Sequence, residues 1–210
     1  MNNILKLTNV IKSYDDKIIL NHINLAFNEG DYLVIYGPVG SGKSTIFNLI
    51  TKSRELTDGT IALYGIDINE YSKKSLELLD TKLAFMPSNI YFDDRLNVSQ
   101  NMELICHHKK ISINEALKMV DAEGINYKNM MSLNGLERIK VYLAGLLMSC
   151  PEALILDEPT GSLDDERSKI IYDILDNIHQ SGVSIMVLTK KNDNLKKGYI
   201  IKTINNGRLI

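Results

Sequence analysis

Cysteine, proline and tryptophan are scarce in this sequence. Its 210 residues include two cysteines, four prolines and no tryptophan. Cys106 and Cys150 have no spacing typical of metal ligands and form no pattern of a disulfide framework, which argues against a disulfide-stapled scaffold. We therefore expect a protein of a reducing compartment in which both thiols are buried as small apolar side chains.

Long apolar runs and an excess of positive charge are also absent. No run reaches the ~18 residues that a membrane-spanning helix needs, and the opening MNNILKLTNV lacks the basic-then-apolar order of a signal peptide. The net charge is −2 and the lysines are dispersed, so we expect no direct nucleic acid binding. We expect a cytoplasmic protein that reaches a membrane only through a partner.

A glycine-rich loop, YGPVGSGKST at positions 36–45, follows a short apolar run. It contains the pattern G-x-x-x-x-G-K-[ST] of the Walker A loop, whose backbone N–H groups surround phosphates. Its lysine supplies a charge for the β- and γ-phosphates, and its serine supplies a hydroxyl for magnesium. The alternative is a glycine-rich turn with a surface lysine. The residues predicted to bind the nucleotide here are Gly37, Pro38, Gly40, Ser41, Gly42, Lys43, Ser44 and Thr45.

The patterns around this loop predict an α/β fold. Short apolar runs rich in β-branched residues predict strands at 4–14, 17–27, 31–36, 60–68, 81–86, 153–157, 183–189, 199–204 and 208–210. Helical periodicity predicts helices at 44–52, 98–110, 112–124, 135–150 and 164–180. We expect a single domain over residues 1–210, with an α/β body at about 1–87 and 151–210 and a helical subdomain at about 88–150.

A second motif, ALILDEPTGSLDD, occupies positions 153–165. Its apolar strand ends at Asp157, and ligands of open α/β sheets bind at this end of the strands. We predict that Asp157, together with Ser44, holds magnesium and that Glu158 is the general base for an attacking water. The alternative is an acidic turn that caps the helix beginning near Asp164. The Walker A loop upstream favours the functional interpretation.

With these two motifs the chain resembles the nucleotide-binding subunits of ABC transporters, from Tyr14 to the terminal hairpin. The segment TGSLD after DEP is most similar to the branch that includes lipoprotein-release, macrolide-efflux and cell-division cassettes. The resemblance implies a P-loop NTPase core of the ABC ATPase type, with an antiparallel β subdomain and a helical insert. It implies that Tyr14 stacks on adenine, with an ordinary strand-end tyrosine as the alternative. It also implies that residues 162–164 couple the halves of a dimer, while Asp164 is equally suited to cap a helix.

Three elements depart from the family pattern, and the first is the signature segment. Where the family has Leu-Ser-Gly-Gly-Gln, this chain has LNGLE at positions 133–137. In the family this segment comes from the opposite protomer and closes on the γ-phosphate with a helix N-terminus. Asn134 keeps the capping and hydrogen-bonding ability, whereas Leu136 adds bulk and Glu137 adds negative charge. The alternative is an ordinary start of an amphipathic helix.

The other two departures are single residues. Ser88 stands where the family has glutamine, and it is too short to span to magnesium and the attacking water, unless a water bridges the gap. Lys190 stands where the family has histidine, and lysine donates hydrogen bonds but cannot accept them; a solvated lysine is the alternative. Each lost positioning group typically costs on the order of 10²-fold in rate. We therefore expect ATP binding to persist and hydrolysis to be slow.

The sequence thus predicts an ABC-type ATP hydrolase of reduced activity, which binds Mg-ATP to drive or gate a separate integral membrane permease subunit. We expect a second ABC subunit, in a homodimer or a heterodimer, at the inner face of the cell membrane. The permease is expected to dock near residues 88–96, with Tyr91 and Phe92 as apolar anchors, although packing within the helical insert is the alternative for both.

Two other classes of function compete with this prediction. The first is a nucleotide-controlled scaffold of a membrane complex, such as a cell-division regulator. The second is a soluble P-loop kinase or a DNA-repair ATPase, which fits less well. Kinases lack the DEPTGSLD arrangement, and the repair ATPases carry long coiled-coil insertions that 210 residues cannot contain.

Overall fold

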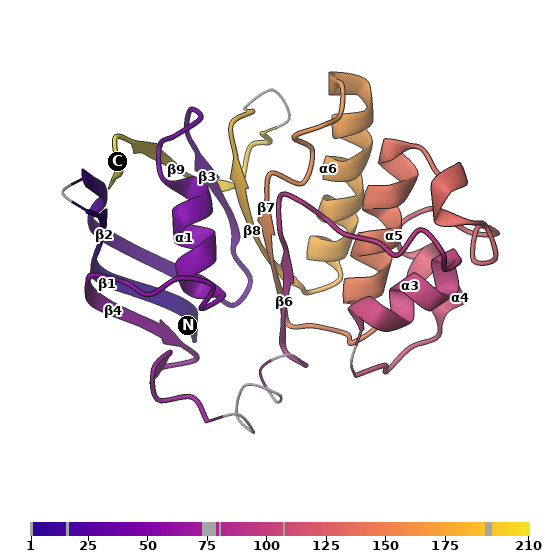
Figure 1. Cartoon of the computed structure of the whole chain (residues 1–210), viewed down its shortest axis with the longest axis horizontal. Coiled ribbons are helices and arrows are strands. Elements are labelled where there is room, and N and C mark those ends of the chain that lie inside the picture. The colour runs from indigo at the N-terminus through magenta and orange to yellow at the C-terminus, as the bar shows by residue number, and fades with distance from the viewer. Residues whose placement is uncertain (1, 16, 73–78, 80, 107, 192–194) are drawn as a thin grey trace.

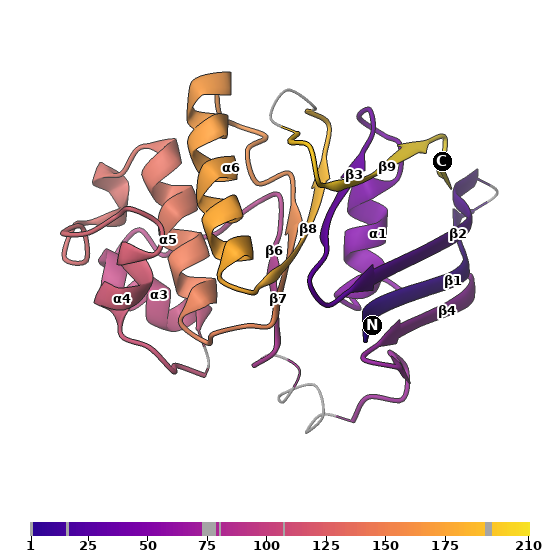
Figure 2. The ribbon, with the colours of Figure 1, turned by 180° about the vertical axis from the view of Figure 1, so that it is seen from behind.

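Two β-sheets and a group of helices make up the structure, a computed structural model that describes residues 2–15, 17–72, 79, 81–106, 108–191 and 195–210 (Figure 1). The antiparallel sheet has the order β2-β1-β4-β5, and the mixed sheet has the order β10-β9-β3-β8-β7-β6. Helix α1 lies between the two sheets, whereas the other labelled helices lie beyond the mixed sheet (Figure 2). This agrees with the expected ABC ATPase core.

The strands and helices have the following bounds. The strands are β1 (Asn3–Tyr14), β2 (Lys17–Asn28), β3 (Tyr32–Tyr36), β4 (Asp58–Leu63), β5 (Ile66–Asp67), β6 (Leu83–Met86), β7 (Ala153–Asp157), β8 (Ser184–Thr189), β9 (Ile200–Asn205) and β10 (Arg208–Leu209). The helices are α1 (Lys43–Ile50), α3 (Val98–Ile105), α4 (Ile113–Lys118), the short 3₁₀ helix η1 (Met130–Ser132), α5 (Gly135–Leu147) and α6 (Asp165–Gln180).

The antiparallel sheet is built on β1, which pairs with β2 on one side and with β4 on the other. The sequence predicted one bent strand at 60–68, and this was wrong. β4 and β5 are two strands that pair antiparallel around Tyr64 and Gly65. Both of these residues have positive φ, at 48° and 80°, as a tight hairpin turn requires.

The parallel strands of the mixed sheet bring distant parts of the chain to one edge. β3 pairs in parallel with β8, and β8 pairs in parallel with β7. All residues of β7 and β8 are buried, as expected of parallel strands covered on both faces. The loop after Tyr36, the carboxylate of Asp157 and the segment after Thr189 therefore lie next to one another.

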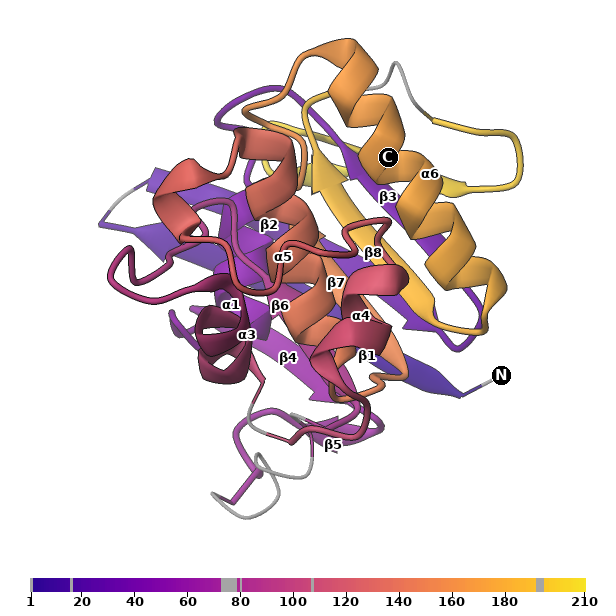
Figure 3. The same ribbon diagram turned by 90° about the vertical axis from the view of Figure 1, so that its right-hand side faces the viewer.

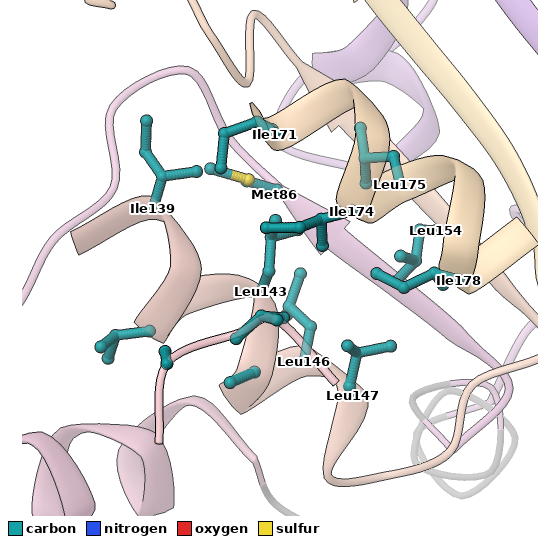
Figure 4. Close-up of a cluster of buried hydrophobic side chains, with 14 of the residues drawn as sticks. Met86, Ile139, Leu143, Leu146, Leu147, Leu154, Ile171, Ile174, Leu175 and Ile178 are labelled. Atoms are coloured by element: carbon teal, nitrogen blue, oxygen red, sulfur yellow. The ribbon is translucent and has the colours of Figure 1, made fainter. Parts of the chain in front are cut away.

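Two hydrophobic clusters cover the two faces of this sheet. One contains α1, the antiparallel sheet and alternate residues of β3 and β8; the other contains α5, α6 and the intervening residues of the same strands. α5 and α6 run side by side over the sheet (Figure 3). Their apolar side chains face each other and the sheet at Met86, Ile139, Leu143, Leu146, Leu147, Leu154, Ile171, Ile174, Leu175 and Ile178 (Figure 4).

The helices after β6 are shorter than predicted, and the cysteines are not buried. α3 ends where Cys106 takes an extended backbone, and His107 lies outside the described residues. Cys106 is half-buried, and burial raises the pKa of its thiol. Cys150 is exposed, because it lies in the turn after α5 with φ of 47°. Within the described residues, no helix has the length and apolar character needed to cross a bilayer.

Candidate functional site

The glycine-rich loop connects β3 to α1 and fits tightly against other strands. The N–H of Gly37 donates to the carbonyl of Thr189 at 3.1 Å. A Cβ on Gly37 would lie 2.3 Å from the carbonyl oxygen of Ile204, and one on Gly42 would lie 2.6 Å from the side chain of Leu20. Gly42 also has φ of 110°, a conformation that favours glycine. The loop therefore requires glycine at these two positions.

Lys43, the first residue of α1, is held inside the loop. Its ammonium donates to the carbonyls of Gly37 at 2.7 Å and of Pro38 at 3.0 Å. It also lies 3.5 Å from Oε1 of Glu158, and its side chain is only 5% exposed. The positive charge thus stands at the N-terminus of α1, where the helix dipole and the free N–H groups add to its attraction for an anion.

Asp157 ends β7 with a buried carboxylate oxygen. The residue is 2% exposed, and its Oδ1 has no hydrogen-bond partner in the part of the chain that the structure describes. Burial raises the pKa of this carboxyl, against the lowering effect of the nearby hydroxyls of Ser44 and Ser88 and of the Lys43 ammonium. A carboxylate oxygen beside a serine hydroxyl is a pair of hard oxygen donors, which fits Mg²⁺.

Glu158 follows in a backbone conformation that is uncommon for its residue type. Its φ is 49°, in the left-handed region. Its backbone N–H donates to Leu188 at 2.8 Å, and its Oε2 accepts from the backbone N–H of Lys190 at 3.2 Å. Strained residues of this kind cluster at functional sites. The carboxylate is thus aimed between Lys43 and Lys190.

A cavity of about 500 Å³ joins most of the predicted residues. Predicted residues at its wall are Tyr14, Gly40, Gly42, Lys43, Ser44, Thr45 and Glu158. The described lining does not include Gly37, Pro38, Ser41 and Asp157, and the carbonyls of Gly37 and Pro38 accept hydrogen bonds from Lys43 instead. The cavity is also lined by Lys17, Ile19 and Val39, which the sequence analysis did not name as site residues, although Val39 lies within the glycine-rich loop and Lys17 of β2 pairs with Tyr14 of β1.

Tyr14 is the last residue of β1 and is exposed. The ammonium of Lys12 lies 4.7 Å from the centre of the ring. One face of the ring is thus occupied by a cation, and the residue also borders the cavity. The geometry suits stacking on a nucleobase, which stays a prediction.

The segment 133–137 lies away from this cavity, at the start of α5. Asn134 is the N-cap of α5 and accepts from the N–H of Glu137 at 3.0 Å, while Glu137 accepts from the N–H of Asn134 at 2.9 Å. Glu137 also lies 3.5 Å from the ammonium of Lys128. The segment is therefore a well-formed capping box. α5 and α1 lie on opposite sides of the mixed sheet (Figure 1), so one copy of the chain does not bring this segment to the glycine-rich loop.

Ser88 and Lys190 meet at a second hollow, of about 290 Å³, which Glu158 also borders. Both residues are exposed, and Ser88 lies in the turn after β6. The structure thus places Ser88 and Lys190, the two altered positions, beside Glu158, the predicted general base. Asp164 caps α6, where its side chain accepts from the N–H of Arg167 at 2.8 Å, so its role as a helix cap is present in the fold.

Comparison with known proteins identifies the family. A family model described as "ABC transporter" matches residues 20–161. The chain is 33% identical to the uncharacterized ABC transporter ATP-binding protein YvrO of Bacillus subtilis (strain 168), with 98% of this chain and 95% of that protein covered. It is 26% identical to the cell division ATP-binding protein FtsE of Streptococcus pneumoniae serotype 2, with 99% and 94% covered.

A solved structure of the same kind confirms the fold. The dimeric bacterial ABC transporter cassette MJ0796 is 27% identical, with a TM-score of 0.85 and 98% of this chain and 96% of that chain covered. The same cassette is also known as a dimer in a post-hydrolysis state, bound to ADP and Pi, with 25% identity and a TM-score of 0.82.

Proposed function

The chain belongs to the ABC transporter family of ATP-binding proteins, and we propose on that basis that it binds Mg-ATP between the glycine-rich loop and the ends of β7 and β8. It is an ATP-binding subunit and ATP hydrolase of this family. ATP-binding subunits of the family dimerise and act with membrane permease subunits. At the inner face of the cell membrane, this chain drives or gates a separate permease through slow hydrolysis.

One observation carries the proposal: Lys43, Asp157 and Glu158 come together at one edge of the parallel sheet, beside the N-terminus of α1. The loop N–H groups and the Lys43 ammonium neutralise the phosphates. Tyr14, which also lines the cavity, stacks on the base. The loop N–H groups, Lys43 and the Asp157 carboxylate, which supply most of the affinity for ATP, are all present, so ATP binding persists.

Ser44 and Asp157 hold the magnesium ion. The buried Oδ1 of Asp157 has no hydrogen-bond partner among the described residues, and a bound cation would satisfy it. Magnesium held there would neutralise charge on the phosphates.

Glu158 is the general base. Its carboxylate accepts a hydrogen bond from the Lys190 N–H and is 16% exposed, so it is both oriented and open to a water molecule. Ser88 and Lys190 border the same hollow but do not replace the reach of glutamine or the acceptor nitrogen of histidine. Hydrolysis is slow for that reason.

The experiment that tests ATP binding is Lys43→Ala, measured by titration calorimetry with Mg-ATP. Loss of a charged contact to phosphate should weaken binding by about 10- to 100-fold. Lys118→Ala, an exposed lysine at the end of α4, is the control and should bind as the unaltered protein does. Because Lys43 is buried, folding of each variant is checked by thermal unfolding. If folded Lys43→Ala binds Mg-ATP as tightly as the unaltered protein, the glycine-rich loop is not the ATP site.

The permease docks in a groove of about 490 Å³ between β6 and the helices α3 and α5. Tyr91, which is 82% exposed, and Leu104, which is also exposed, line this groove. Phe92 does not serve as an anchor, contrary to the sequence prediction. It is buried, its ring lies 5.9 Å from that of Tyr142, and the Arg138 guanidinium lies 5.3 Å from it.

Replacing Tyr91 and Leu104 together by serine should release the permease from a detergent-solubilised complex without unfolding the cassette. The matched control is Tyr127→Ser, because Tyr127 is equally exposed and lies outside the described lining of the groove. A complex that survives the double substitution would place the docking surface elsewhere.

The similarity to FtsE over 99% of the chain supports a second candidate, a nucleotide-controlled scaffold of a membrane complex. Both candidates use the same ATP site. Co-purification from detergent-solubilised membranes separates them, because it identifies the membrane partner as a transport permease or as a component of the division machinery.

A further inference from the structure

Lys191, a residue outside both phosphate-handling motifs, has its ammonium bound by three oxygens at the start of α6. Its Nζ donates to the carbonyl of Leu163 at 2.7 Å and lies 3.4 Å from both Asp165 Oδ1 and Ser168 Oγ. The side chain is only 21% exposed, and Ser168 is fully buried. The lysine thus connects the segment after β8 to the loop that follows Glu158.

These contacts close a ring that contains the predicted base. From Glu158 the chain turns twice, with Gly161 N–H donating to the Glu158 carbonyl and Leu163 N–H donating to that of Thr160. Leu163 is then bound by Lys191, and the neighbouring Lys190 N–H donates to the Glu158 carboxylate. Movement of either side of the ring therefore displaces the hydrogen bond that orients the carboxylate.

The stability of α6 does not account for a lysine at this place. The N-terminus of a helix carries partial positive charge, so a cation there is unfavourable. α6 already has Asp164 as its N-cap and acidic residues at Asp165 and Glu166 in its first turn. The Leu163 carbonyl and the Asp165 carboxylate hold the Lys191 ammonium at the start of α6. These contacts connect the loop 162–164 to the segment that follows β8.

We propose that Lys191 is a positioning residue for ATP hydrolysis, which holds the loop 162–164 and the segment after β8 as one unit and so keeps the Glu158 carboxylate in place. The inference rests on the proposed role of Glu158. Lys191 does not line the cavity in the described part of the chain, whereas Lys190 does. Its loss should therefore lower kcat and leave the affinity for ATP unchanged.

The test is Lys191→Met, which keeps the length of the side chain and removes the donor. Misplacement of a catalytic group should lower kcat by about 10- to 100-fold, with KM for ATP and the melting temperature close to those of the unaltered protein. Lys191→Arg keeps a donor and should recover most of the rate. Lys169→Met, an exposed lysine of the same helix, is the control and should change nothing.

Two results would overturn the inference. One is an unchanged kcat in Lys191→Met, and the other is a fall in kcat accompanied by a matching rise in KM or a large loss of thermal stability. The proposed function fails separately, if Lys43→Ala keeps its ATP affinity or Glu158→Gln hydrolyses as the unaltered protein does. If Glu158→Gln loses activity while Lys191→Met keeps the kcat of the unaltered protein, only the proposed role of Lys191 is disproved.

Discussion

Asp157 and Glu158 are neighbours in the chain, yet the fold gives them different surroundings. Asp157 is the last residue of a fully buried strand, its Oδ1 has no hydrogen-bond partner among the described residues, and the hydroxyls of Ser44 and Ser88 lie near its carboxyl group. Glu158 turns out of the strand with positive φ and reaches Lys43 and the Lys190 N–H. The sequence motif predicted where both carboxylates are. It could not predict the backbone turn that separates them, because a positive φ outside glycine is imposed by the surrounding packing.

Glu158→Gln should stop hydrolysis and keep ATP bound. A general base contributes about 10²- to 10⁴-fold, so turnover should fall by at least ~100-fold. The amide oxygen can still accept from the Lys190 N–H, and a negative charge is removed from beside the phosphates, so affinity should not fall. Phosphate release and calorimetry measure the two quantities.

Glu152→Gln is the matched control for this variant, because Glu152 lies just before the other end of β7 and pairs with Lys82 at 2.9 Å on the surface. It should hydrolyse ATP normally. Normal hydrolysis by Glu158→Gln itself would assign the base to another residue.

The elements of the fold were predicted well by periodicity, and the errors lie where single residues end them. The pattern extended one helix over 98–110, but the extended backbone of Cys106 ends it. The pattern predicted the following helix over 112–124, but α4 ends at Lys118, and Asp121 and Gly124 beyond it have positive φ. The spacing of apolar residues shows which face of a helix is buried, but the same spacing can persist beyond the residue at which the helix ends. The boundaries of the helical subdomain near 88 and 150 stay a prediction.

Asn134 should stabilise the fold as the N-cap of α5, whether or not residues 133–137 also contact ATP in a dimer. Asn134→Ala removes the acceptor for the Glu137 N–H and should lower the free energy of unfolding by about 1 kcal/mol. Ser112→Ala, in the equivalent box of α4, is the comparison and should cost a similar amount. Asn134→Ser keeps a good cap and should leave stability unchanged. Urea unfolding measures all three, and a fully stable Asn134→Ala would contradict the helix-cap role.

The site forms only when the whole chain is folded, since its residues come from the ends of β1, β3, β7 and β8. Sequence motifs predicted the loop and the acidic pair, because each is continuous in the chain. Neither motif contains Ser88 or Lys190, about a hundred residues apart; the family resemblance assigned both to the site, and the structure shows that they border one hollow with Glu158. Nor could the motifs reveal Lys17 and Ile19 at the cavity wall, which depend on how the antiparallel sheet packs against the loop.

The isolated protein should be a slow ATPase even as a dimer, because a symmetric assembly repeats every altered position in both of its sites. A partner cassette with an intact signature segment would replace residues 133–137 at one site, but Ser88 and Lys190 come from the same chain as the Walker A loop. Turnover, measured as steady-state phosphate release, should therefore stay well below the ~10 s⁻¹ of an ordinary enzyme. Ser88→Gln combined with Lys190→His should raise it, since the pair restores reach and an acceptor beside Glu158. A fast unaltered protein, or a double variant no faster than its parent, would show that these two residues do not limit hydrolysis.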